Sequence, residues 1–226
     1  MPSDKESKVK RTVLIVDDHA VFREGLVWIL DHENDLSVCG KAEDSVEALR
    51  LAAQLKPDLA LVDVSLEGMN GIDLTKALRS RFPRMRIVVL SMHQETLYAE
   101  RALRAGANGY IMKRENGEEL LGAIRHVLRG QSYVSPEFNE YLLEKISVQV
   151  GEKPSSPEDR LSDRELEIFR LIGQGYGTRQ IADSLHISIK TVEFHRENIR
   201  AKLNLNSTFE LVQHAIHWTH YEKESH

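Results

Sequence analysis

Short apolar runs alternate with longer amphipathic stretches from residue 13 to residue 129, and this alternation constrains the fold more than any other feature. The runs are mostly continuous, as expected of strands covered on both faces. The expected strands are Val13 to Val16, Leu36 to Gly40, Leu59 to Val62, Ile87 to Leu90 and Gly109 to Met112. The expected helices are Ala20 to Leu30, Ser45 to Leu55, Gly71 to Arg81, Thr96 to Arg104 and Gly117 to Arg129. The pattern predicts an α/β domain with a parallel sheet.

The second half of the chain shows only helical periodicity. A helix over Pro136 to Ile146 is possible, and the glycine, prolines and serines of Val150 to Arg160 indicate a flexible linker. Four short helices are expected beyond it. The predicted domains are residues 11–130, a linker at 131–158, and a helical domain at 159–220.

Composition sets limits on the partners of this chain. It has 226 residues, 41% apolar residues and a formal net charge of -5, which argues against a surface coated with basic patches. DNA binding is not excluded, because affinity depends on where Lys and Arg cluster. The polar N-terminus precedes an apolar run too short for a signal peptide or a membrane span, so a soluble cytoplasmic protein without membrane attachment is expected.

Polar side chains stand where four of the expected strands end. They are Asp17, Asp18, Asp63, Ser91 and Lys113. In an open parallel sheet the carboxyl ends of the strands share one edge, so these residues are expected to converge on one acidic pocket. Adjacent carboxylates repel one another unless a cation neutralises them, and Mg²⁺ prefers such oxygen ligands. Alternatively, Asp17 and Asp18 cap the helix that begins near Ala20.

Asp63 is the candidate nucleophile of this pocket. A carboxylate can form an aspartyl phosphate, with Lys113 neutralising one phosphoryl oxygen and the Ser91 hydroxyl contacting another. Alternatively, Asp63 is a solvated loop carboxylate. A third possibility is a phosphatase or phosphotransferase that turns over small phosphoesters, although no Asp-x-Asp pair stands at Asp63.

The C-terminal helices suit DNA. Ser162 and Glu165 form a capping-box pattern, and glycines at 173, 175 and 177 are expected to stop the helix that follows. Two helices at Thr178 to Leu185 and Ile189 to Leu203 flank a short turn, which is typical of a helix-turn-helix. The alternative is an interaction-only helical bundle that mediates dimerisation.

The first half of the chain resembles the receiver domain of two-component response regulators. The motifs that carry the resemblance are Leu14-Ile15-Val16-Asp17-Asp18-His19, Leu61-Val62-Asp63, Gly68-Met69-Asn70-Gly71, Leu90-Ser91-Met92 and Gly106-Ala107-Asn108-Gly109-Tyr110-Ile111-Met112-Lys113. The resemblance implies a doubly wound five-stranded sheet of order 2-1-3-4-5. It also implies that a sensor histidine kinase phosphorylates Asp63, and that the protein is a regulator rather than an enzyme.

The same resemblance assigns further roles. Asp17, Asp18, Asp63 and the backbone carbonyl of Ser65 would bind Mg²⁺ directly or through water. Ser91 and Tyr110 would be the switch pair, the hydroxyl moving toward the phosphoryl group and the ring following it inward. One departure is Glu67, which stands where receivers usually have proline and makes phosphate lifetime and kinase choice harder to predict.

Residues 161–215 resemble the DNA-binding domain of the LuxR family, and a receiver joined to such a domain defines the NarL/FixJ subfamily. The motifs include Ser162-Asp163-Arg164-Glu165, Ile181-Ala182, Lys190-Thr191-Val192 and Glu210-Leu211-Val212. The resemblance places the helix Ser188 to Leu203 in the major groove of double-stranded DNA. The implied base contacts are Lys190, Glu193, Phe194 and Glu197, with Thr178, Thr191, Arg196 and Arg200 nearer phosphates.

In that family the last helix of the domain, here Ser207 to His217, pairs with the same helix of a second subunit. The resemblance therefore implies a homodimer on activation, formed through this helix and the receiver. Leu211, Val212, Ala215 and Ile216 form its apolar stripe. The alternative is packing onto its own domain, and different residues can serve both roles. The histidines near the C-terminus do not have the spacing of a zinc site and are expected to be solvated.

Overall fold

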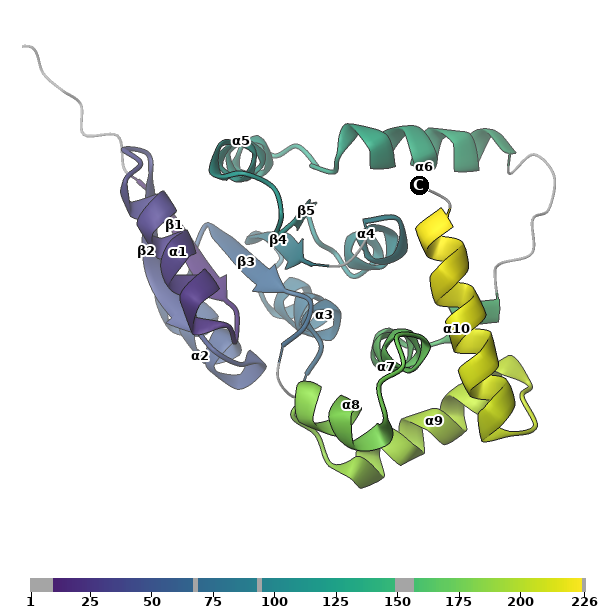
Figure 1. Ribbon diagram of the computed structural model, residues 1–226. Coiled ribbons are helices and arrows are strands. Elements are labelled where there is room, and N and C mark those ends of the chain that lie inside the picture. Colours follow the sequence, from purple (N-terminus) through teal and green to yellow (C-terminus); the bar gives the residue numbers. More distant parts are fainter. Residues whose placement is uncertain (1–9, 67–68, 93–94, 149–156, 225–226) are drawn as a thin grey trace, which may run out of the picture. The chain divides into compact units, whose positions relative to one another are not determined.

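The computed structural model describes residues 10–66, 69–92, 95–148 and 157–224 (Figure 1). Glu67 therefore lies outside the described residues. The chain divides into two compact units, Met1–Lys145 and Ile146–His226. Each unit is described by itself.

The first unit contains a five-stranded parallel sheet of order β2-β1-β3-β4-β5. The strands are β1 (Arg11–Val16), β2 (Leu36–Ala42), β3 (Leu59–Asp63), β4 (Arg86–Ser91) and β5 (Gly109–Met112). This order confirms the doubly wound 2-1-3-4-5 fold expected from the sequence. The largest differences from the predicted ranges are two additional residues at the start of β1 and at the end of β2.

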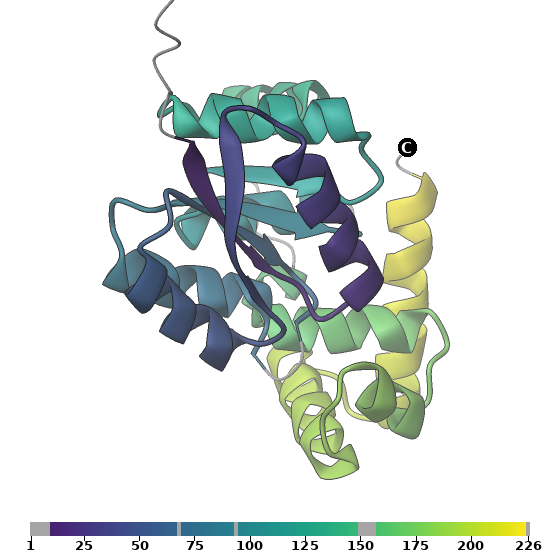
Figure 2. The same cartoon turned by 90° about the vertical axis from the view of Figure 1, so that its left-hand side faces the viewer.

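Helices cover both faces of this sheet (Figure 2). They are α1 (Ala20–Asp31), α2 (Ser45–Leu55), α3 (Gly71–Arg81), α4 (Glu95–Arg104) and α5 (Gly117–Leu128). Each differs from its predicted range by at most one residue at either end. Local signals explain several of their starts: Asp44 caps α2 by accepting from the Glu47 amide at 2.8 Å, and Asn116 forms a capping box with Glu119.

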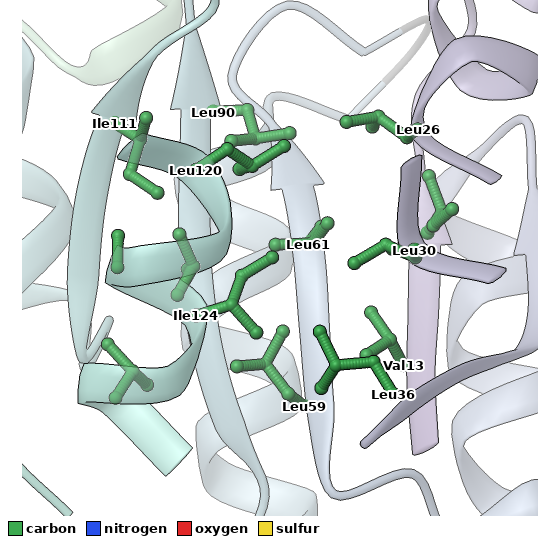
Figure 3. Close-up of a cluster of buried hydrophobic side chains, with 14 residues drawn as sticks. Val13, Leu26, Leu30, Leu36, Leu59, Leu61, Leu90, Ile111, Leu120 and Ile124 are labelled. Carbon is green, nitrogen blue, oxygen red and sulfur yellow. The ribbon is translucent and has the colours of Figure 1, made fainter. Parts of the chain in front are cut away.

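The sheet has a separate apolar core on each face. Side chains of α1 and α5, including Leu26, Leu30, Leu120 and Ile124, pack on one face (Figure 3). Side chains of α2 and α3 pack on the other face. Alternate residues of β1 supply both cores, since Val13 belongs to the first and Leu14 to the second. Burial on both faces explains why the strands are continuous apolar runs.

The first unit extends beyond the predicted domain end at residue 130. The Tyr133 carbonyl accepts a hydrogen bond from the Tyr110 amide at 3.0 Å, and the Tyr133 amide donates to the Asn108 carbonyl at 2.9 Å. Helix α6 (Pro136–Val148) follows, in agreement with the helix expected from Pro136. Within the predicted linker at 131–158, Tyr133 thus pairs with β5, and a 3-10 turn, η1 (Pro157–Arg160), begins near its end.

The second unit contains the predicted helix-turn-helix. Its helices are α7 (Asp163–Gly173), α8 (Thr178–Ser184), α9 (Ile189–Leu203) and α10 (Thr208–Glu224). The α7 capping box forms as expected, because the Ser162 hydroxyl accepts from the Glu165 amide and Glu165 accepts from the Ser162 amide at 2.7 Å. Helix α10 extends beyond its predicted end at His217.

Helix α7 ends at Gly173, as the sequence predicts. A Cβ at this residue would lie 2.3 Å from the Ala215 carbonyl oxygen of α10. This glycine therefore also permits α10 to pass close to the end of α7. Gly175 follows the helix end with φ of +88°, a conformation that favours glycine.

No helix in the described part of the chain is long and apolar enough to span a lipid bilayer.

Candidate functional site

The carboxyl ends of β1 and β3 bring the predicted acidic residues together. Val16 pairs with Val62 in the parallel ladder, so Asp17 and Asp63 follow at the same edge of the sheet. Asp17 is fully buried, Asp63 is 2% exposed, and the Asp18 side chain is 18% exposed. Buried carboxylates destabilise the folded state unless a positive charge compensates them.

Lys113 supplies a positive charge between two of these carboxylates. Its Nζ lies 2.8 Å from Asp17 Oδ2 and 2.7 Å from Asp63 Oδ2. The Lys113 amide donates to the Ser91 carbonyl at 2.7 Å, which fixes the residue beside the end of β4. Its ammonium group also lies 4.6 Å from the centre of the Phe22 ring. One lysine therefore serves both buried carboxylates.

The pKa of Asp63 reflects the balance between burial and the charges in the pocket. Burial raises the pKa of this carboxyl to about 6, against the lowering effect of Lys113 and with a further increase from Asp17. A hydrogen bond from the Ser65 amide acts with Lys113 to favour the ionised form. The positive charge present is thus too small to hold Asp63 at its ordinary pKa, and a further cation would stabilise the carboxylate.

The ligand atoms of the pocket fit a divalent cation. One ligand atom from each of Asp17, Asp18, His19 and Asp63 lies within 4.8 Å of all the others. Asp17 Oδ2, Asp18 Oδ1 and Asp63 Oδ2 are buried and accept no well-aligned hydrogen bond from the described residues, although Lys113 and His19 nitrogens lie close by. Three such oxygens suit Mg²⁺, which takes oxygen ligands.

His19 was not among the predicted site residues. Its Nδ1 lies 2.6 Å from Asp18 Oδ1, 3.5 Å from Asp17 Oδ1 and 3.9 Å from Asp63 Oδ2. Its amide donates to Asp17 Oδ1 at 2.9 Å, which closes a local turn. Its position directly after the two aspartates was the only sequence signal for this arrangement.

The structure also brings Ser91 and Tyr110 together. Both residues are fully buried, and a hydrogen bond joins their side chains. Burial raises the pKa of the Tyr110 phenol, and the hydrogen bond to Ser91 opposes this increase. The ring therefore lies inside the unit, next to the strand end that carries Ser91.

Gly71 and Asn70 fix the loop behind Asp63. A Cβ on Gly71 would lie 1.8 Å from the Asp63 carbonyl oxygen, so only glycine permits this approach of α3 to β3. The Gly71 amide donates to the Val64 carbonyl at 2.8 Å, and the Asn70 side chain caps α3 by accepting from the Ile72 amide at 2.9 Å. The backbone around Asp63 is thereby held in place.

The predicted DNA-contacting residues of α9 form one outer face. Lys190, Glu193, Phe194 and Glu197 are exposed, and Phe194 retains 63% of its surface. Thr191, Arg196 and Arg200 are half-buried, as is Thr178 at the start of α8. Val192, Ile199 and Leu203 are buried on the opposite side of α9. The helix therefore presents a polar face with one exposed aromatic ring.

Three of the predicted contacts, Thr191, Glu197 and Arg200, are engaged within the domain. Arg200 donates to Glu197 at 3.1 Å and to the Asn206 carbonyl at 3.3 Å, while the Thr191 hydroxyl lies 2.7 Å from that of Ser188 in the α9 cap. Arg164 anchors the turn between α8 and α9, because it donates to the Leu185 carbonyl at 3.1 Å. The turn is thus tied to α7.

Some apolar residues of α10 are buried in their own unit, and others are exposed. Leu211 and Ala215 are fully buried in their own unit, whereas Ile216 is 39% and Phe209 is 68% exposed. The expected solvation of the histidines is wrong for His214, whose Nε2 lies 2.7 Å from Glu158 Oε1 and whose ring packs against Phe169. His217 and His220 are exposed.

Comparisons with known proteins agree with this geometry. Residues 13–125 match the family model described as the response regulator receiver domain, and residues 159–215 match the bacterial regulatory proteins of the luxR family. The chain belongs to the two-component response regulators of the NarL/FixJ type, which regulate transcription. Its two domains are those of a regulator that acts in two-component control of transcription.

Among its relatives is the oxygen regulatory protein NreC. The chain is 40% identical to NreC of Staphylococcus carnosus over 208 residues, which cover 90% of this chain and 96% of that protein. It is 41% identical to NreC of Staphylococcus aureus strain MRSA252 with the same coverage.

Solved structures of response regulators share the fold. RcsB of Salmonella typhimurium is 28% identical and matches with a TM-score of 0.63 over 91% of this chain and 96% of that chain. RcsB bound to the promoter rprA in the presence of the phosphomimetic BeF3- is 27% identical, with a TM-score of 0.59 over 90% of this chain and 97% of that chain.

Proposed function

We propose that Asp63 is the phosphoryl acceptor of this response regulator and that a sensor histidine kinase is the donor. The observation that carries the proposal is the Lys113 ammonium group, which lies 2.7 Å from Asp63 Oδ2 in a buried pocket. It can neutralise charge on an incoming phosphoryl group at the oxygen that attacks. The pKa of Asp63, about 6, leaves most of this carboxyl ionised at neutral pH.

In the proposed reaction a carboxylate oxygen of Asp63 forms a bond to phosphorus as the bond from phosphorus to the donor breaks. The electron pair of the broken bond leaves with the donor, and the product is an acyl phosphate on Asp63. Asp17, Asp18, Asp63 and the Ser65 carbonyl would hold Mg²⁺. When bound, the ion neutralises phosphoryl charge. Lys113 and the Ser91 hydroxyl would bind the phosphoryl oxygens.

The Ser91 and Tyr110 pair is the proposed relay from this site. The two side chains are hydrogen-bonded, so movement of the Ser91 hydroxyl toward a phosphoryl oxygen breaks the bond that Tyr110 makes. Loss of this bond changes how the buried Tyr110 ring packs inside the receiver. A charge added at Asp63 can in this way bias a two-state element.

Incubation with acetyl phosphate and Mg²⁺ tests the acceptor. Intact-mass analysis should show one added phosphoryl group on the wild-type chain, and none on the Asp63→Asn variant. The matched control is Asp73→Asn, which removes an exposed carboxylate of α3 that pairs with Lys76 at 2.9 Å. A modified Asp63→Asn chain, or an unmodified wild type, would reject the proposal. Repeated turnover of the donor would favour a phosphatase.

We further propose that α9 lies in the major groove of promoter DNA. Lys190, Glu193, Phe194 and Glu197 are its proposed base contacts, because they share the exposed face. Thr178, Thr191, Arg196 and Arg200 are the proposed phosphate contacts. Glu193 would accept a hydrogen bond from cytosine N4. The protein would act in the cytoplasm, where bacterial DNA lies.

Dimerisation on activation is proposed to use the receiver and α10. Phe209 and Ile216 supply exposed apolar surface on this helix, whereas Leu211 and Ala215 already serve the core. Selection of genomic fragments by the phosphorylated protein, followed by gel shifts at near-physiological salt, tests DNA binding. Loss of binding to every sequence would favour an interaction-only helical unit.

A further inference from the structure

A hollow opens at the amino ends of the strands, at the edge of the sheet opposite Asp63. Its volume is about 580 Å³, within the range of small-molecule sites. The lining residues come from the starts of β1 and β4, from the loops before β3 and β4, and from the ends of α2 and α5. They are Arg11, Ala52, Lys56, Pro57, Asp58, Phe82, Pro83, Arg84, Met85, Arg86 and Leu128. We call this feature the amino-end hollow.

The amino-end hollow is strongly positive within a negative protein. Four cationic side chains and one carboxylate line it, which gives a local charge of +3 against -5 for the whole chain. Both oxygens of the carboxylate, Asp58, already accept hydrogen bonds. Its Oδ1 accepts from Arg11 at 2.8 Å, and its Oδ2 accepts from the amide and the hydroxyl of Thr12 at 2.8 and 3.0 Å.

Among the described residues, the other three cations of the hollow have no acidic partner. Lys56 and Arg84 are exposed and Arg86 is half-buried, and no carboxylate of the described residues forms an ion pair with any of them. Their charges repel one another across the hollow. An anion bound among them would relieve this repulsion and make charge-assisted hydrogen bonds.

The wall of the hollow is fixed before any ligand binds. Arg79 Nη1 donates to the Pro83 and Met85 carbonyls, both at 2.8 Å, and its Nε donates to the Gly106 carbonyl at 2.9 Å. These bonds hold the loop before β4 and keep two of its carbonyl oxygens engaged with Arg79. A preformed site loses less entropy when a ligand binds.

The remaining lining residues are apolar, and three of them carry rings. Phe82 is half-buried and Pro83 is exposed, whereas Pro57 is buried, and neither proline carries an amide donor. The side chains of Lys56, Arg84 and Arg86 are therefore the groups that can bind an anion. The Phe82 and Pro83 rings can contact a flat apolar group. We propose that the amino-end hollow binds a small organic phosphate with a planar ring, the chemical class to which nucleotides belong.

Calorimetric titration of the full chain with ADP tests this inference. The titration is done in EDTA without Mg²⁺, so that phosphate does not bind at Asp63 through a metal ion. We expect saturable binding of one ADP per chain. The double variant Lys56→Gln and Arg84→Gln should bind at least about tenfold more weakly, because it removes two of the three cations proposed to make charge-assisted hydrogen bonds to the phosphate.

The matched control is Arg50→Gln, which removes an exposed cation of α2 that already pairs with Glu47. It should bind ADP as the wild type does. Adenosine should not bind detectably, and inorganic phosphate should bind more weakly than ADP, because each lacks one half of the proposed recognition. Thermal unfolding of each variant shows whether the fold is intact.

Three results would overturn the inference. They are absence of ADP binding to the wild-type chain at millimolar concentration and low salt, unchanged affinity in the folded double variant, and tighter binding of an oligoglutamate peptide than of ADP. The last result would assign the hollow to an acidic protein partner instead.

Discussion

The acidic pocket of the receiver and the outer face of α9 use charge in opposite ways. In the pocket, Asp17 and Asp63 are 0% and 2% exposed and share one lysine. On α9, Lys190, Glu193 and Glu197 stand in solvent. A buried charge interacts strongly with its neighbours because water does not screen it, whereas an exposed charge is weakly coupled to the fold.

This difference separates two kinds of sensitivity to mutation. Under the proposed function, a change in the pocket should alter both the chemistry at Asp63 and the stability of the receiver. A change on the face of α9 should alter recognition of DNA and leave the helical unit folded. The following experiments test this separation.

The largest effect is expected for Lys113→Gln. Loss of its ammonium group leaves Asp17 and Asp63 without their shared cation, so the rate of phosphorylation by acetyl phosphate should fall about 100-fold or more. Phosphate incorporation over time measures this rate. Lys76→Gln, a change to an exposed lysine of α3, should leave it unchanged. A Lys113→Gln chain phosphorylated at the wild-type rate would show that the pocket does not depend on this charge.

The second prediction concerns pH. Asp63 has a pKa of about 6 in the folded receiver and 3.8 when unperturbed. Between these values the folded state holds more protons, so its stability should fall as pH rises from about 4 to about 6, by about 2–3 kcal/mol in EDTA. Urea unfolding at several pH values measures this change.

Asp63→Asn should remove that part of the pH dependence, since the amide does not titrate. Saturating Mg²⁺ should weaken it in the wild type, because the bound cation stabilises the carboxylate. Identical pH profiles for the wild type and the variant would contradict the raised pKa.

A smaller effect is expected for Phe194→Ala. Loss of the aromatic ring should weaken binding to selected promoter DNA by about tenfold, because an apolar contact to a thymine methyl is lost. The free energy of unfolding of this variant should change by less than about 0.5 kcal/mol, because the Phe194 side chain is 63% exposed. Val46→Ala, a change to an apolar residue of the receiver that is 76% exposed, is the control for gel shifts. A Phe194→Ala chain that unfolds easily would place this ring in the core.

The smallest effect is expected for Ser162→Ala. Loss of the α7 cap should destabilise the helical unit by about 1 kcal/mol and leave phosphorylation of Asp63 unchanged. Trp218, whose ring lies 5.3 Å from Phe169, reports unfolding of this unit by fluorescence in a Trp28→Phe background. Ser162→Asn keeps a capping side chain and should retain the stability. Equal losses in both variants would point to a role other than capping.

Most of the fold could be predicted because its signals are local. Continuous apolar runs marked the strands, and capping residues such as Ser162 and Asn116 marked helix starts. The pocket was predictable for a related reason: parallel strands end at one edge, so the residues after β1, β3, β4 and β5 must lie near one another.

Other features could not be read from local patterns. The sequence marked Gly173 as the end of a helix, but it did not show that the close approach of α10 also requires a glycine there. Residues 131–135 looked like linker because they lack periodicity, yet Tyr133 pairs through its backbone with β5. His214 carried no distinct sequence signal, since its partner Glu158 lies 56 residues away in the chain and is brought to it by packing.

The sequence by itself determined the two-part architecture, the order of strands and helices, and the identity of the side chains at the strand ends, because periodicity and capping act over a few residues. The tertiary structure decided that one lysine lies between Asp17 and Asp63, that Tyr110 is buried against Ser91, and that four cations surround the amino-end hollow. These relations join residues far apart in the chain. They depend on packing and on charges brought out of water, which no local pattern records.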